Sequence, residues 1–231
     1  MTRTTFEREL QGVKDEVLLM ASMVEDAVLK SAEALRDNNL MRSQLVLEND
    51  SFINRKRYEI ELVVLTLMAT QQPAARDLRI LTASLDICTE LERIGDYAKG
   101  IANINLRSQG LSLPKMLKDI FSMAEKAVDL LHRAMTAFSE DDHQTARDLI
   151  LEDDVIDKCY TELYTHAVNN VLNDPRNMER SNYLIAVAHN LERLGDRATN
   201  ICERVIYIAS GEIPASALTT GRLQLPPDKN W

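Results

Sequence analysis

Pairs of oxygen-bearing side chains spaced four residues apart are the feature of this sequence that could do chemistry. Residues four apart share one face of a helix, where two like charges destabilise an isolated helix by about 0.2–0.5 kcal/mol. A cluster of such carboxylates needs water, an arginine or a cation beside it. An all-oxygen set suits a hard divalent cation such as Mg²⁺, Mn²⁺ or Ca²⁺, or iron. The pairs are Asp50 with Asn54, Glu92 with Asp96, Asp153 with Asp157, and Glu192 with Asp196.

Two helical hairpins would bring these pairs together. The pairs centred on positions 52 and 94 are equally distant from Pro73, and those centred on 155 and 194 are equally distant from the Asp174-Pro175 step. If antiparallel helices are joined at these turns, the two pairs of each hairpin lie side by side, at the same distance along the helices from the turn, roughly 30 Å. Apolar residues that recur about every 3.6 positions predict the helices. They cover about residues 4–38, 41–70, 75–108, 114–138, 142–173 and 176–210.

The same three-helix unit occurs twice in the chain. The segment LERIGDYAKGI at 91–101 returns as LERLGDRATNI at 191–201, an offset of 100, whereas the middle helices match at an offset of 103. Length differences confined to the connections are expected of a structural repeat. We therefore predict an all-α fold of two tandem antiparallel three-helix bundles, residues 1–109 and 110–210, followed by a flexible C-terminal tail, 211–231.

Two glycines and one histidine adjoin the predicted clusters. Gly95 and Gly195 lie inside predicted helices, where glycine costs about 1 kcal/mol relative to alanine. Close packing of a neighbouring helix is the interpretation that we favour, and close approach of a ligand is the alternative. His189 precedes Glu192 by three residues and could extend the second cluster, although a lone histidine is more often a surface or core residue.

Composition narrows the class of protein. The net charge of −9 opposes binding to nucleic acid, and the longest basic run, 55–57, is typical of a solvated helix face. The three cysteines include no CxxC spacing, which indicates a reducing compartment. The N-terminus lacks an apolar leader, and the longest apolar run, about 62–69, is too short to span a membrane. We expect a cytoplasmic protein. Neither a nucleophile constellation nor a glycine-rich phosphate loop is visible, so we do not expect an enzyme.

Three motifs in the chain resemble the PhoU family of phosphate-signalling regulators. They are QQPAARDLR at 71–79, LERIGDYAKGI at 91–101 and LERLGDRATNICE at 191–203, and the resemblance extends from the first helix to about Ser210. It implies the tandem three-helix-bundle fold. It also implies a negative regulator of the phosphate regulon and of phosphate uptake, acting between the ATPase subunit of the phosphate ABC transporter and its sensor histidine kinase.

The resemblance also bears on the carboxylates, because some members of the family carry metal clusters on paired E/D-x-x-x-D motifs. These motifs correspond to Glu92 with Asp96, Glu192 with Asp196, and Asp153 with Asp157. Asp50 with Asn54 departs from the pattern, since a neutral amide is a weaker ligand. Metal occupancy of the first bundle is therefore less expected than that of the second.

Other functions remain open. A carboxylate-bridged iron store or metalloenzyme would carry Glu-x-x-His motifs, but this chain has only His189-x-x-Glu192, in the reverse order. A metal-free helical scaffold with solvated acids is the third possibility. For the adaptor, we expect a homodimer that contacts the membrane only through its partners.

Overall fold

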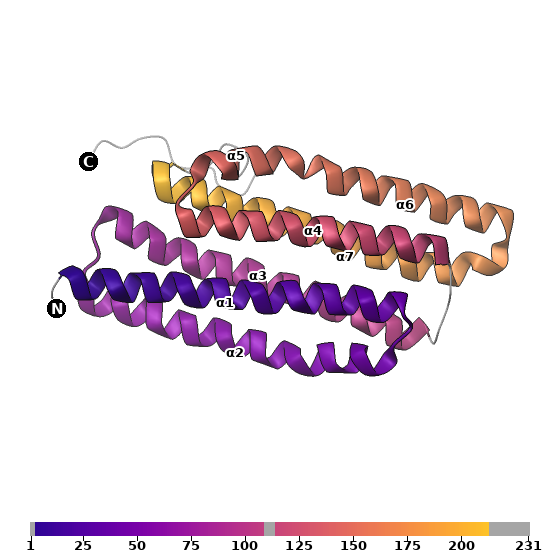
Figure 1. Ribbon diagram of the computed structural model, residues 1–231, viewed down its shortest axis with the longest axis horizontal. Coiled ribbons are helices and arrows are strands. Elements are labelled where there is room, and N and C mark those ends of the chain that lie inside the picture. Colours follow the sequence, from indigo (N-terminus) through magenta and orange to yellow (C-terminus); the bar gives the residue numbers. More distant parts are fainter. Residues whose placement is uncertain (1–2, 109–113, 213–231) are drawn as a thin grey trace, which may run out of the picture.

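The computed structural model describes residues 3–108 and 114–212, and these residues form long helices without a strand (Figure 1). Apart from residues 211 and 212, the predicted tail lies outside the described residues. The elements in chain order are α1 (Arg3–Arg36), α2 (Leu40–Gln71), α3 (Ala75–Ser108), α4 (Pro114–Glu140), α5 (His143–Glu152), α6 (Asp154–Asn173), the 3₁₀ turn η1 (Pro175–Asn177) and α7 (Met178–Ser210).

Local signals begin and end these helices where the sequence places them. The Asn39 side chain accepts a hydrogen bond from the backbone N–H of Arg42, at 3.0 Å, and so caps the N-terminus of α2. Asp142 caps α5 in the same way. Gly211 ends α7 with a φ of 76°, a left-handed conformation that glycine adopts without steric cost.

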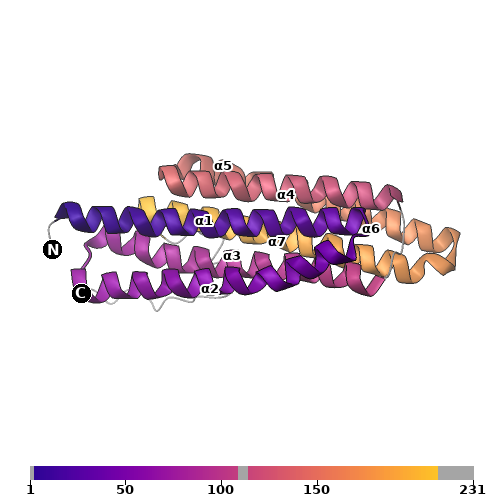
Figure 2. The same ribbon diagram turned by 60° about the horizontal axis from the view of Figure 1, so that its bottom comes forward.

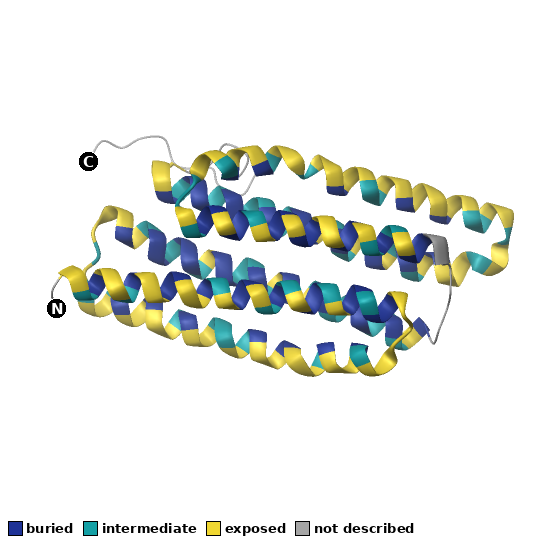
Figure 3. Ribbon diagram, in the orientation of Figure 1, coloured by how far each residue is buried: buried dark blue, intermediate teal, exposed yellow. Residues whose placement is uncertain are grey.

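Four helices form the centre of the molecule and the others cover its edges. α1 and α3 of the first bundle pack along α4 and α7 of the second, while α2 packs only on α1 and α3. Figure 2 shows α2 on the outer side of these two helices. The α5–α6 pair lies at the opposite edge (Figure 1). Accordingly, buried residues run along the central helices, and the outer faces of α2 and α6 are largely exposed (Figure 3). No described helix is long and apolar enough to cross a bilayer.

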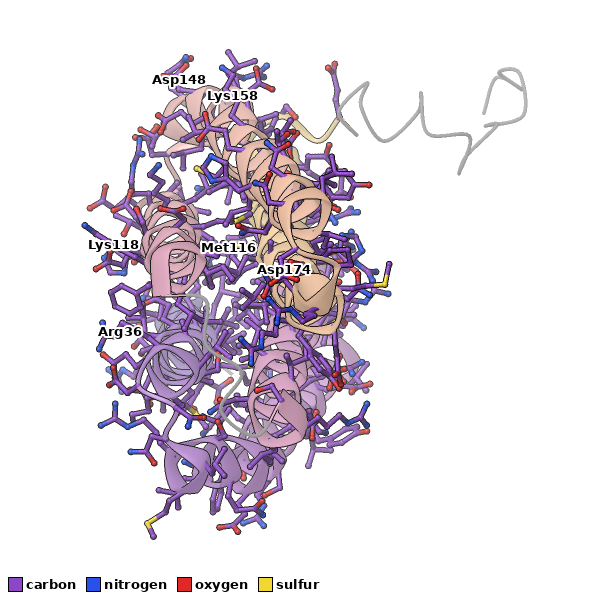
Figure 4. The ribbon with its side chains drawn as sticks, turned by 90° about the vertical axis from the view of Figure 1, so that its right-hand side faces the viewer. Arg36, Met116, Lys118, Asp148, Lys158 and Asp174 are labelled. Atoms are coloured by element: carbon purple, nitrogen blue, oxygen red, sulfur yellow. The ribbon has the colours of Figure 1, made fainter. Side chains whose placement is uncertain are left out.

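Polar contacts join the two bundles. Lys14 of α1 is 5% exposed, and its Nζ donates to the Ser139 carbonyl at 3.1 Å and to Asp141 Oδ1 at 3.0 Å. At the other end of α1, Arg36 lies 4.3 Å from the centroid of the Phe121 ring of α4. In the end-on view Arg36 lies on the outer side of the molecule, whereas Met116 points between α4 and the α6–α7 turn (Figure 4).

The fifth predicted helix is not continuous. The expected segment 142–173 is divided at Asp153, where the backbone N–H of Ile156 bonds to the Asp153 carbonyl at 2.8 Å, a turn tighter than an α-helical one. Glu152, Asp153 and Asp154 place three carboxylates in succession here. Aspartate has a low helix propensity, which favours a break at this point.

Candidate functional site

The first cluster of carboxylates lies between α2 and α3 and contains its own cations. Asp50 is 7% exposed, and its Oδ2 accepts hydrogen bonds from Lys99 Nζ at 2.7 Å and from Asn54 Nδ2 at 3.1 Å. Arg57 Nη1 lies 3.6 Å from Glu92 Oε2. The acids of this cluster are therefore paired with basic side chains of the same bundle.

All three acids of the first cluster affect the pKa of Lys99. The hydrogen bond to Asp50 is the largest cause that raises the pKa of Lys99, and the negative charges of Asp96 and Glu92 raise it further. These three acids therefore face one ammonium group, as the hairpin about Pro73 predicts.

The second cluster lies between α6 and α7 and has no cation at the corresponding places. The repeat offsets match Lys99 to Thr199 and Arg57 to Tyr160, both neutral. Burial, together with the negative charges of neighbouring acids, raises the pKa of Asp153 to about 6. These acids are Asp157, Asp196, Glu192 and Asp154. The hairpin about Pro175 thus gathers its acids at one height as well, but without an internal counter-ion at those two positions.

Basic side chains near the second cluster do not satisfy its innermost oxygens. Asp153 Oδ1 and Glu192 Oε2 are buried and form no hydrogen bond. His189 Nδ1 lies 3.1 Å from Glu192 Oε2 and opposes the rise in the pKa of Glu192. Burial raises the pKa of Glu192 and of Asp196, although nearby Arg197 opposes the effect at Asp196. Asp153 Oδ1 is therefore a buried carboxylate oxygen of this site that has no hydrogen-bond partner among the described residues.

Each cluster includes a glycine, but only one of the two is required by close helix packing. A Cβ atom at Gly195 would collide with Asp153 Oδ1, whereas a Cβ at Gly95 would touch Ile53 Cδ1 at 3.4 Å, an ordinary contact. The packing interpretation therefore holds for Gly195, while at Gly95 an alanine would fit. At Gly195 the group that approaches is the candidate ligand Asp153 itself, so the missing side chain makes room for the site.

A comparison with known families gives the identity of the fold. The model of the PhoU domain matches this chain twice, over residues 17–104 and 120–205. The chain belongs to the PhoU family. Because this is a family of regulatory and accessory proteins, the expectation that the chain is not an enzyme is confirmed, and the metalloenzyme alternative falls.

Relatives of the PhoU family extend over nearly the whole chain. The PhoU homologue of Clostridium acetobutylicum, named a phosphate-specific transport system accessory protein, is 32% identical over 213 residues, which is 92% of this chain and 97% of the relative. The accessory protein PhoU of Escherichia coli K12 is 28% identical over 207 residues, 90% of this chain and 86% of the relative.

Solved PhoU structures confirm the predicted fold class. The crystal structure of the phosphate transport system regulatory protein PhoU from Streptococcus pneumoniae matches with a TM-score of 0.84 and 26% identity, over 90% of this chain and 99% of that one. PhoU from Pseudomonas aeruginosa matches with a TM-score of 0.81 and 32% identity, over 90% and 100%.

The two clusters of this PhoU-family chain differ in how well they suit a metal ion. In the first, which comprises Asp50, Asn54, Glu92 and Asp96, the Lys99 ammonium lies against Asp50 and already supplies a positive charge. In the second, the buried Asp153 oxygen without a hydrogen-bond partner suits a hard cation. Within residues 3–108 and 114–212, however, no three His, Cys, Asp or Glu side chains are gathered as ligands of one ion. Side chains of the second cluster would have to rotate toward a shared ion.

The sequence analysis missed the counter-ions of the first cluster. Lys99 follows Asp96 by three residues, so it shares the face of the acid pair. Thr199 occupies the same place in the second copy. Comparing the two copies position by position for charge, instead of only for matching acids, would have revealed that one cluster carries a lysine and the other does not.

Proposed function

We propose that this PhoU-family chain is an accessory regulator of a phosphate-specific transport system. In this role it represses the phosphate regulon and phosphate uptake, as an adaptor between the ATPase subunit of the phosphate ABC transporter and a sensor histidine kinase. The observation that carries the proposal is the similarity to proteins named phosphate-specific transport system accessory proteins, which extends over both repeats.

The outer helices support an adaptor role, because an adaptor needs two surfaces. α2 and α6 lie at opposite edges of the molecule, and their outer faces are largely exposed (Figure 3). Both helices expose large apolar side chains. On α2 these include Phe52, Tyr58 and Leu62; on α6 they include Tyr164 and Leu172. Apolar groups that remain exposed on a folded chain commonly mark surfaces for other proteins. One such surface on each edge would allow two partners to bind at once.

Recovery of partners from cells tests the adaptor proposal. The tagged full-length chain is purified from cells grown in high phosphate, and we expect both the transporter ATPase and the sensor kinase to accompany it. Deletion of its gene should release a phosphate-regulon reporter from repression in high phosphate. Absence of both proteins from the purified material, together with an unchanged reporter, would refute the proposal.

We further propose that the second cluster binds a hard divalent cation or iron. Asp153, Asp157, Glu192 and Asp196 would hold it, and it would supply the positive charge that this cluster lacks. Its support is the buried Asp153 oxygen that has no hydrogen-bond partner, surrounded by the other acids of the cluster. Since these acids come from α6 and α7, their shared ion would fasten the outer helix to the centre of the molecule.

Matched double variants test the metal proposal. Asp153→Asn with Glu192→Gln should abolish metal retention measured by elemental analysis after dialysis against Mg²⁺, Mn²⁺, Ca²⁺ or Fe²⁺. Asp50→Asn with Glu92→Gln, the corresponding change in the first bundle, should leave it unchanged. Equal metal content in the wild type and both variants, with unchanged helical circular dichroism, would instead support the metal-free scaffold. Loading with many iron ions per chain would support an iron store.

A further inference from the structure

An apolar groove lies between the N-terminal half of α1 and the C-terminal half of α2, along the outer side of the first bundle. Its volume is about 660 Å³. Val13, Ile60 and Leu67 are buried and form its floor, while Leu62 and Val63 are exposed along its α2 side. In Figure 1 the two half-helices run side by side at the end of the molecule that carries the N-terminus. The groove is large enough to receive several side chains of a docked helix.

Gly12 keeps the α1 side of this groove open. A Cβ atom built at Gly12 would meet nothing within 4 Å, so packing within the chain does not require a glycine there. Glycine is also the poorest helix former after proline. A larger residue at position 12 would extend into the groove without displacing any neighbour. This position therefore gives a direct means to block the groove.

Carboxylates surround the apolar floor. Glu9, Glu16 and Glu59 lie along the rim, together with a single lysine, Lys56. Lys56 Nζ is already paired, at 2.9 Å from Glu16 Oε2 and at 3.1 Å from Glu59 Oε2. The rim thus keeps a net negative charge. An apolar floor with an acidic rim complements an amphipathic helix whose apolar face is flanked by lysine or arginine.

At the corresponding place, the described residues of the second bundle form a smaller and more polar pocket. A pocket between α4 and α6 includes the repeat equivalents of Lys56, Glu59 and Val63, which are Cys159, Glu162 and His166. Its volume is about 150 Å³, and charged or polar side chains dominate its lining. The apolar groove is therefore a property of the first bundle and not a feature that the repeated helix packing creates by itself.

A second copy of this chain would fit the groove poorly. In a twofold-symmetric contact the same patch meets itself, so the net negative rim formed by Glu9, Glu16, Glu59 and Lys56 would meet a second rim of the same sign. The net charge of −9 would add to the repulsion. Charge therefore favours a basic partner over self-association through this surface.

We infer that the α1–α2 groove binds an amphipathic helix of a partner protein, with an apolar face seated on Val13, Ile60 and Leu67 and basic residues against the rim. The identity of the partner rests on the proposed adaptor function. The inference adds that one of the adaptor's partners binds to this surface of the first bundle. Binding by this mode does not involve either carboxylate cluster.

A synthetic peptide tests the groove directly. The probe is a fluorescein-labelled 18-residue helix of leucine and lysine with all leucines on one face, and the control peptide has the same composition in shuffled order. Fluorescence anisotropy should show about tenfold tighter binding of the amphipathic peptide. Gly12→Leu should weaken that binding about tenfold, because the added side chain occupies the groove. The circular dichroism spectrum of Gly12→Leu should match that of the wild type, and its melting temperature should be equal or higher.

Two charge variants separate docking from simple attraction between opposite charges. Glu59→Lys should weaken peptide binding about threefold, since a rim charge contributes modestly. Glu162→Lys, the same change at the repeat-equivalent position on α6, should leave it unaltered. Equal binding of both peptides, or equal binding by the wild type and Gly12→Leu, would overturn the inference. So would a wild-type dimer in sedimentation that Gly12→Leu converts to a monomer, because the occupant would then be a second copy.

Recovery of partners from cells, repeated with Gly12→Leu, distinguishes an error in the groove inference from an error in the proposed adaptor function. If the wild type recovers the transporter ATPase or the kinase and Gly12→Leu loses one of them, the inference is supported. If Gly12→Leu recovers both as well as the wild type does, the groove inference is refuted and the adaptor function stands. If the wild type recovers neither, the adaptor function fails, and the peptide measurement alone decides the inference.

Discussion

The two bundles place the same acid pattern at the same height and balance its charge in opposite ways. In the first, Lys99 donates to Asp50 at 2.7 Å, and Arg57 lies beside Glu92. In the second, the equivalent positions hold threonine and tyrosine, and Asp153 keeps a buried oxygen without a partner. In one copy the buried aspartate is thus paired with a lysine, while in the other the buried aspartate has a raised pKa. The helix packing is shared by the two copies, but three differences change the electrostatics: Lys99 against Thr199, Arg57 against Tyr160, and Asn54 against Asp157.

This difference has an energetic consequence. A buried carboxylate paired with an ammonium group retains its ionised form, whereas an unpaired one is destabilised by burial and by its neighbours. The pKa of Asp153, raised to about 6, records that destabilisation. The first bundle should therefore be intrinsically more stable around its cluster, and the second should be the part of the molecule that responds to cations.

The largest expected effect is on metal affinity, when the residues at positions 99 and 199 are exchanged between lysine and threonine. Thr199→Lys would place an ammonium group in the second cluster, where we expect it to displace a bound cation and to lower metal affinity at least tenfold, about 1.4 kcal/mol. Titration calorimetry with Mn²⁺ measures this change. Lys99→Thr is the converse and should give the first cluster measurable affinity. Unchanged Mn²⁺ affinity in Thr199→Lys would show that the missing lysine is not what distinguishes the clusters.

Neutralising the equivalent aspartates should change stability in opposite directions when a chelator removes metal. Asp50→Asn removes the charge partner of Lys99 and should lower the free energy of unfolding by about 1 kcal/mol. Asp153→Asn removes repulsion and should raise it by about 1 kcal/mol, a value reduced for the partial exposure of Asp153. Melting temperatures should then separate by several degrees. The comparison between the bundles fails if both variants shift in the same direction.

The dependence of stability on pH should identify the unpaired aspartate. The pKa of Asp153 is raised from 3.8 to about 6 in the folded chain. The folded state therefore binds this proton more tightly than the unfolded state, and the contribution of Asp153 to stability is lost as pH rises from about 4 to 6. In chelator, the melting-temperature gap between Asp153→Asn and the wild type should open across this interval. A gap that is constant with pH would place the effect elsewhere.

The sequence predicts the helices well and their electrostatics less well. The range expected for the third helix, 75–108, is that of α3, because apolar periodicity and Pro73 are local signals. The break at Asp153 was not predicted, since the apolar period continues through it. Asp153 Oδ1 lies against Gly195 of a distant helix, a contact that local sequence signals do not predict. Likewise, hairpin arithmetic gives the height of each acid pair but not whether a lysine such as Lys99 turns toward it.

The smallest expected effect concerns the two glycines. Gly95→Ala should raise the free energy of unfolding by about 0.5 kcal/mol, because alanine favours the helix and its Cβ would meet Ile53 at an ordinary distance. Gly195→Ala gains the same helix propensity, but its Cβ would force Asp153 Oδ1 to move, so the net change should be close to zero. Thermal unfolding in chelator compares the two. Equal stabilisation by both alanines would mean that Asp153 rotates away freely, and the second cluster would then be less rigid than its buried oxygens indicate.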